Sequence, residues 1–121
     1  MKKKFIVLRF SSLGDIVLTS STLINIKITY PSSTISFLCK ERYKEIAEQL
    51  PGTDEILTIP DKISLKDYYK FILELDNNNF SDIVDLHGNF RSWMARKLIT
   101  ADNKVVYPKR RMERTLLVKV K

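Results

Sequence analysis

The chain has 121 residues, 44% of them hydrophobic and 29% charged, which fits one globular domain and argues against intrinsic disorder. A single cysteine, Cys39, excludes an internal disulfide framework, and no apolar run approaches the ~18 residues that a membrane helix needs. The basic start is followed by an apolar run too short for a secretory signal, so the protein is predicted to be cytoplasmic.

The positive charge is concentrated at one end of the chain. The net charge is +7, and residues 104–121 hold seven basic groups and one acid, so this segment contributes +6 and the rest only +1. A localised basic patch suits a phosphate-bearing partner such as nucleic acid, an anionic membrane surface or a phosphorylated lipid. The alternative is a solvated basic tail without a partner.

Strand-like and helix-like segments alternate along the chain. Apolar, β-rich runs predict strands, and helical spacing of apolar residues predicts the helices between them. Five strands alternating with four helices predict an α/β domain with a Rossmann-like parallel sheet of order 3-2-1-4-5. The strands are expected at 4–9, 34–38, 55–59, 82–86 and 104–107, and the helices at 15–30, 43–50, 64–76 and around 93–98.

Two polar, glycine-containing loops are expected to meet in this topology. In the order 3-2-1-4-5, strands one and four are neighbours, and ligands bind between their carboxyl ends. Residues 10–15 follow strand one, and residues 87–91 follow strand four. The predicted binding site therefore lies where these two loops converge.

The first loop, Ser11-Ser12-Leu13-Gly14-Asp15, leads from a strand into a helix. Gly14 is expected to allow a tight turn and the close approach of a ligand, and the amide groups at a helix start favour anions. The loop is neither a dinucleotide fingerprint nor a phosphate loop. Asp15 is a candidate catalytic group, although an aspartate in a first helical turn also stabilises the helix end without any catalytic role.

The second loop contains His87, the only histidine of the chain, beside Gly88. A lone histidine at a strand end can be a turn residue or a site residue, and both readings stay open here. Asn89, Arg91 and Ser92 could bind substrate or could simply start the next helix. No cluster of Cys, His, Asp or Glu has metal-ligand spacing, so no metal and no other cofactor is expected.

Together these motifs resemble the lipopolysaccharide heptosyltransferases of glycosyltransferase family 9. The similarity lies in the stretch from Phe5 to Thr19, in Asp-Leu-His-Gly-Asn-Phe-Arg-Ser at 85–92, in Tyr30-Pro31 with Ile-Ser-Phe-Leu at 35–38, in 40–43, and in the basic Tyr-Pro-Lys-Arg-Arg at 107–111. It covers nearly the whole chain, and Ser-Ser-Leu-Gly-Asp after the first strand is its most specific element.

The resemblance implies the N-terminal, acceptor-side half of a type B glycosyltransferase fold. It implies metal-independent, inverting transfer of a heptose from ADP-heptose to a lipid-linked, phosphate-bearing lipopolysaccharide core acceptor, with Asp15 as the general base. The aspartate would take the proton of the attacking sugar hydroxyl. The residues then expected to contact substrate are Ser11, Ser12, Gly14, His87, Gly88, Asn89, Arg91, Ser92, Lys109, Arg110 and Arg111.

The resemblance also bears on domain organisation and partners. Residues 1–108 are expected to form the acceptor-side domain, and residues 109–121 a basic, helical tail leading toward a C-terminal nucleotide-binding domain that this chain lacks. The chain is therefore expected to be a fragment, inactive alone, with possible peripheral contact with the inner membrane. The alternative is a stand-alone Rossmann-like module that binds nucleic acid or another anionic partner through its tail. Nucleic acid is not expected, because Tyr107 is the only aromatic residue among the basic groups.

Overall fold

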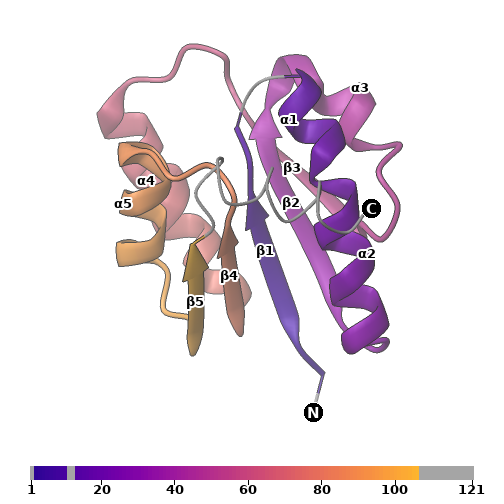
Figure 1. Ribbon diagram of the computed structural model, residues 1–121. Helices are drawn as coiled ribbons and strands as arrows, with labels where there is room; N and C mark the ends of the chain where they lie inside the picture. Colours follow the sequence, from indigo (N-terminus) through magenta and orange to yellow (C-terminus); the bar gives the residue numbers. More distant parts are fainter. Residues whose placement is uncertain (1, 11–12, 107–121) are drawn as a thin grey trace.

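The computed structural model of the chain describes residues 2–10 and 13–106, which form one parallel sheet with helices on both faces (Figure 1). The strands stand in the order β3-β2-β1-β4-β5, and every neighbouring pair is parallel, so the predicted fold class and strand order are confirmed. The strands are β1 (Lys4–Leu8), β2 (Thr34–Lys40), β3 (Glu55–Ile59), β4 (Asp82–Asp85) and β5 (Asn103–Val106).

The helices divide between the two faces of the sheet. On one side lie α1 (Leu13–Leu18), α2 (Ser20–Thr29) and α3 (Lys44–Ala47), which follows the short 3-10 helix η1 (Glu41–Tyr43). On the other side lie α4 (Leu65–Leu75) and α5 (Phe90–Leu98), with the 3-10 helix η2 (Asp76–Asn78) after α4. This is the three-layer arrangement that βαβ crossovers produce.

The central strand explains why both faces are covered. Successive side chains of a strand point to opposite faces. In β1, Phe5 and Val7 belong to the core beneath α1 to α3, while Ile6 and Leu8 belong to the core beneath α4 and α5. All four are at most 4% exposed. The continuous apolar run of β1 therefore marks a strand that is buried on both sides, as is usual in parallel sheets.

Two predicted helices differ from the observed ones. The segment 15–30 is interrupted at Thr19, whose hydroxyl donates to the carbonyl of Ile16 and whose N–H is shared between the carbonyls of Asp15 and Ile16. This local bonding tightens the turn and separates α1 from α2. The expected helix at 43–50 is reduced to the four residues of α3. The tail predicted to be helical lies outside the described residues.

Helix α4 begins and ends as its sequence predicts. The Ser64 side chain accepts a hydrogen bond from the Asp67 N–H at 3.1 Å, which caps the helix start. At the other end, Asn79 follows η2 with a left-handed φ of 57°, a conformation that asparagine tolerates better than most residues. The Asn77–Asn79 cluster thus stops the helix and returns the chain to β4.

Candidate active site at the carboxyl ends of β1 and β4

The loops after β1 and β4 lie side by side, as the strand order predicts. Leu8, the last residue of β1, pairs with Asp85, the last residue of β4, and the Leu86 N–H donates to the Leu8 carbonyl at 3.0 Å. Two residues after the end of each strand, the rings of Phe10 and His87 lie 5.1 Å apart. Ser11 and Ser12 fall outside the described residues, so their predicted contacts stay predictions.

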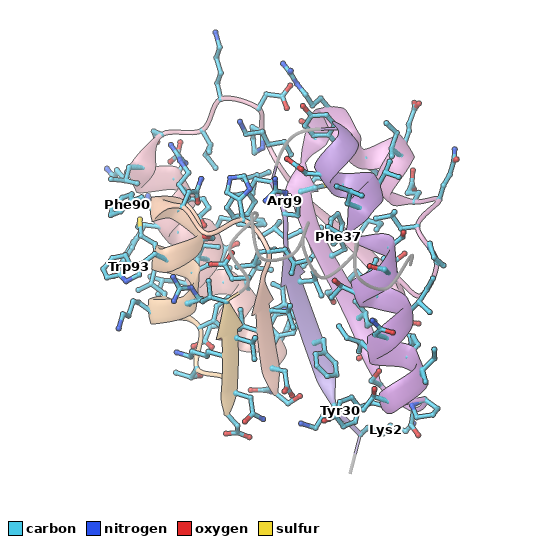
Figure 2. The ribbon with its side chains drawn as sticks, viewed as in Figure 1. Lys2, Arg9, Tyr30, Phe37, Phe90 and Trp93 are labelled. Carbon is cyan, nitrogen blue, oxygen red and sulfur yellow. The ribbon has the colours of Figure 1, made fainter. Side chains whose placement is uncertain are left out.

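A buried ion pair joins the end of β1 to the start of α1. The Arg9 guanidinium donates to the Asp15 carboxylate, and the two residues are only 3% and 5% exposed. The second terminal nitrogen of Arg9, Nη1, donates to the Leu86 carbonyl at 2.6 Å. Arg9 therefore connects both loops, and it lies near the carboxyl end of β1 at the centre of the sheet (Figure 2).

The pair fixes where the Asp15 carboxylate lies. Asp15 stands in the first turn of α1, where a negative charge is favourable, and a neighbouring guanidinium favours the ionised carboxylate further. Burial of such a pair requires hydrogen bonds for every polar atom, yet the Nε of Arg9 is buried without a partner. The contact therefore fixes the position of the Asp15 carboxylate at the sheet edge and leaves one nitrogen of Arg9 without a partner.

Sequence reasoning overlooked Arg9 as a site residue. The signal was present, because a charged residue ends an otherwise apolar strand immediately before the polar loop. A buried strand rarely carries an unpaired charge, so the arginine required a partner within reach of the loop. The first acidic side chain after it in the sequence is Asp15.

His87 lies near enough to this pair to feel both charges, in a setting that keeps the imidazole neutral. Burial, together with the positive charge of Arg9, lowers the pKa of His87 to about 4. Its Nδ1 is buried without a hydrogen-bond partner, and its ring packs against Phe10. A neutral imidazole near pH 7 can donate or accept a hydrogen bond but adds no positive charge to the site.

Asp85 holds the second loop in place. One carboxylate oxygen accepts the N–H groups of His87 and Gly88, both at 2.9 Å, and the other accepts from the Nε of Arg96 at 2.9 Å. The side chain is fully buried. Because the contacts found for this carboxylate all lie within the fold, Asp85 acts as a structural residue that positions His87.

Three of the predicted binding residues form the turn into α5. Gly88 has a left-handed φ of 67°, which glycine adopts without strain. Asn89 and Ser92 form a reciprocal capping box, in which the Asn89 side chain accepts from the Ser92 N–H and the Ser92 hydroxyl accepts from the Asn89 N–H, each at 2.9 Å. Asn89 and Ser92 therefore have the helix-start role that the sequence left open. The substrate contacts expected for Gly88, Asn89 and Ser92 stay predictions.

Arg91 ties α5 to the segment before α4. Its Nη2 donates to the Ile63 carbonyl at 3.0 Å, and its guanidinium lies over the Tyr68 ring at 5.2 Å from the centroid. The Tyr68 hydroxyl in turn donates to the Arg91 carbonyl. The other terminal nitrogen, Nη1, is buried without a partner. Arg91 is thus largely engaged in packing.

Gly14 differs from the expectation of a tight turn. The left-handed φ values of the described glycines belong to Gly52 and Gly88, and Gly14 lies inside α1. A Cβ added at Gly14 would meet no heavy atom within 4 Å. The backbone at Gly14 is exposed and faces open space, which is the condition for the close approach of a ligand that the sequence predicts.

No helix within residues 2–10 and 13–106 is long and apolar enough to cross a membrane. Across the same ranges, no three side chains of His, Cys, Asp or Glu come together as they would to hold a metal ion. The predicted acceptor contacts of Lys109, Arg110 and Arg111 fall outside these ranges and stay predictions.

Comparison with known proteins finds similar chains but no matching family model. The chain is 26% identical over 102 residues to lipopolysaccharide heptosyltransferase 1 of Campylobacter coli, an alignment that covers 83% of this chain and 30% of that protein. It also superposes on the glycosyl transferase family 9 protein of Veillonella parvula with a TM-score of 0.76 and 25% identity, covering 87% of this chain and 32% of the other. The resemblance to the heptosyltransferases is confirmed.

A second solved structure agrees in fold. Escherichia coli ADP-heptose lps heptosyltransferase II matches with a TM-score of 0.76 over 91% of this chain and 32% of the other, at 16% identity. That identity supports a common fold alone. The chain spans about a third of the length of the proteins that it matches, so the heptosyltransferase-like segment described here is one part of what those proteins contain.

Proposed function

We propose that this segment is the acceptor-side half of an inverting, metal-independent glycosyltransferase that transfers a heptose from ADP-heptose to a lipopolysaccharide core acceptor. The observation that carries the proposal is the Arg9–Asp15 pair at the shared edge of β1 and β4, in a chain similar to heptosyltransferases. Ligands bind at this edge of doubly wound sheets, at the point where the strand order reverses. The fold thus supports a site at Asp15.

In this proposal Asp15 is the general base. A sugar hydroxyl is a weak nucleophile, and it must lose its proton as it attacks the anomeric carbon of the donor. The Asp15 carboxylate would take that proton, while the bond from the anomeric carbon to the nucleotide diphosphate breaks on the opposite face. Arg9 would hold the carboxylate ionised and oriented. A second, nucleotide-binding domain of the type B fold would bind the leaving diphosphate.

The other site residues have smaller proposed roles. Neutral His87 lies at the same edge and would hydrogen-bond the acceptor without adding charge. The open backbone at Gly14 leaves room for a sugar ring to approach α1. Lys109, Arg110 and Arg111 would attract phosphate groups of the acceptor, an attraction that salt screens. The reaction is expected on the cytoplasmic side of the inner membrane.

The proposal is tested by Asp15→Asn in the full-length protein that carries this segment. Asparagine keeps the size of the side chain and its hydrogen-bonding capacity but cannot take the proton. The turnover number should fall by about 10²–10⁴-fold, while the KM for the acceptor changes little. The measurement is steady-state transfer of heptose from ADP-heptose to a water-soluble core acceptor.

The matched control is Asp82→Asn, which changes an aspartate at the opposite, amino-terminal end of β4, where it pairs with Lys3 at 3.4 Å. This variant should keep normal kinetics. If Asp15→Asn transfers heptose as fast as the unmodified protein, Asp15 only stabilises the start of α1, and the proposed mechanism is wrong.

A further inference from the structure

The outer side of α5 exposes an aromatic pair. Phe90 and Trp93 are 60% and 44% exposed, and their rings stack at 5.8 Å between centroids with an interplanar angle of 19°. Lys97, one helical turn further on, places its Nζ 5.9 Å from the centre of the Trp93 ring. Figure 2 shows both rings on the side of α5 that points away from the sheet.

This face carries one exposed cation, Lys97, beside the aromatic rings. Helix α5 contains Arg91, Arg96 and Lys97 and no acidic residue. The first two are engaged inside the fold, Arg91 by the Ile63 carbonyl and Arg96 by Asp85. Lys97 is exposed, and Lys104 reaches the carbonyl of Arg96 from β5. The complement of such a surface is apolar and negatively charged.

The aromatic pair also lies close to the candidate active site. Phe90 is the first residue of α5 and directly follows Asn89, the cap at the end of the loop that carries His87. A partner bound to Phe90 and Trp93 would therefore lie at the start of the helix that directly follows the His87 loop.

We infer that Phe90, Trp93 and Lys97 form a docking surface for the interface of an anionic lipid bilayer. Aromatic rings of this kind settle at the level of lipid headgroups, and nearby lysines are attracted to anionic headgroups. The choice of a bilayer over another anionic partner rests on the proposed function, because a lipid-linked acceptor presents its sugar at a membrane surface. Docking through α5 would hold the Asp15 edge beside that sugar.

Trp93 gives a direct test, because it is the only tryptophan of the chain. The 121-residue chain is titrated with vesicles of phosphatidylglycerol and phosphatidylethanolamine, and with vesicles of phosphatidylcholine alone. The Trp93 emission should move to shorter wavelength with the anionic vesicles and much less with the neutral ones, and the chain should sediment with the anionic vesicles. Added salt should weaken this binding.

Two variants keep the reporter and probe the surface. Phe90→Ser should weaken vesicle binding by about tenfold, because the exposed ring no longer enters the interface. Lys97→Gln should weaken it by about fivefold, since one basic residue near an anionic surface contributes about that factor. The matched control is Ile28→Ser, which removes a side chain that is 71% exposed on α2, across the sheet from α5. It should bind like the unmodified chain.

Several results would overturn the inference. They are equal binding to both kinds of vesicle, equal loss in Ile28→Ser and Phe90→Ser, or a Trp93 shift with soluble core saccharide but not with vesicles. Concentration-dependent dimerisation that Phe90→Ser abolishes would show that a second copy of the chain covers the surface instead.

The membrane inference can fail separately from the proposed function. Asp15→Asn should bind vesicles normally, because its side chain is buried away from the surface of α5. Phe90→Ser, in the full-length protein, should transfer heptose normally to a water-soluble acceptor and lose rate only with an acceptor embedded in vesicles. Loss of transfer to the soluble acceptor in Phe90→Ser would instead assign the ring to the active site and contradict a role confined to the membrane.

Discussion

Two buried aspartates flank the sheet edge where the loops after β1 and β4 meet, and they differ in what surrounds them. Asp85, the last residue of β4, accepts hydrogen bonds from two backbone N–H groups and from the Arg96 guanidinium, so its contacts account for its burial. Asp15, after β1, pairs with Arg9, whose Nε is buried without a partner. A buried ion pair that leaves an arginine nitrogen without a partner adds little net stability to a fold, and buried charged pairs are common at functional sites, which favours a functional role for the Arg9–Asp15 pair.

The comparison predicts different consequences for the two aspartates. Changes at Asp85 should reduce the free energy of unfolding without removing a proposed catalytic group, whereas changes at Asp15 should abolish transfer in addition to any loss of stability. Each variant below can therefore be measured in two ways, by chemical unfolding of the 121-residue chain and by transfer kinetics in the full-length protein.

The largest effect on stability is expected from breaking the pair on the arginine side. Arg9→Met leaves the Asp15 carboxylate buried without its guanidinium, and loss of one partner of a buried pair costs about 3–5 kcal/mol. The double variant Arg9→Met/Asp15→Leu should recover most of that stability, because neither charge of the pair remains. Urea unfolding of the three proteins measures both effects.

Transfer kinetics show whether the Arg9–Asp15 pair is needed for activity as well as for stability. The double variant should be stable and inactive, since the proposed base is gone. If instead the double variant is as unstable as Arg9→Met alone, the pair is not the source of the cost, and the contrast with Asp85 loses its basis.

Asp85→Asn should reduce the free energy of unfolding by about 2–3 kcal/mol. Asparagine can still accept the two N–H groups through its oxygen, but the charge that binds Arg96 is lost, and a hydrogen bond between charged groups is worth about this much. Asp82→Asn should cost less, because Asp82 pairs with a Lys3 side chain that is 30% exposed. If both variants lose the same free energy of unfolding, burial of Asp85 does not strengthen its pair with Arg96.

The fold was largely predictable from the sequence, and the site only in part. The apolar runs predict β1 and β3, and strand order alone brings the loops after β1 and β4 together. What the sequence could not show was which charged side chains form ion pairs. The spacing of six residues between Arg9 and Asp15 has no fixed meaning outside a helix or a strand, so their contact appears only once the turn between β1 and α1 is built.

Helix α5 illustrates the same limit. The sequence predicts a helix around 93–98, which includes Trp93, and the structure exposes that ring. Apolar residues at helical spacing predict that a helix has an apolar face. Where a helix carries apolar residues on two faces, the spacing does not show which face packs against the core. Likewise, Asn89 and Ser92 were recognised as possible helix-start residues, and the reciprocal bonds between them depend on the loop conformation that Gly88 permits.

The pH dependence of stability should report on His87. The pKa of His87 is about 4 in the folded chain, below the ordinary value of 6.5. Between these two pH values the unfolded chain therefore binds a proton at His87 that the folded chain does not bind. Stability is therefore complete above pH 6.5 and falls as the pH drops from 6.5 toward 4. After allowance for partial solvent exposure, the loss should be about 1–2 kcal/mol.

His87→Gln removes the titrating group and serves as the control. The difference in unfolding free energy between pH 7 and pH 4.5 should be smaller in this variant by about 1–2 kcal/mol than in the unmodified chain. If the difference in unfolding free energy is the same in both proteins, the loss of stability at low pH comes from the aspartates and not from His87.

The smallest expected effect concerns Gly14, and here stability and transfer should change in opposite directions. Gly14 lies inside α1 without a left-handed φ, and a Cβ there meets no atom within 4 Å. Gly14→Ala should therefore raise the free energy of unfolding by about 0.5–1 kcal/mol, the usual gain from replacing glycine in a helix. The same methyl group would project into the space through which the proposed acceptor approaches Asp15, so the KM for the acceptor should rise while the turnover number changes less. A more stable variant with an unchanged KM would mean that the acceptor does not pass over α1, and the site would have to be moved toward the loop of His87.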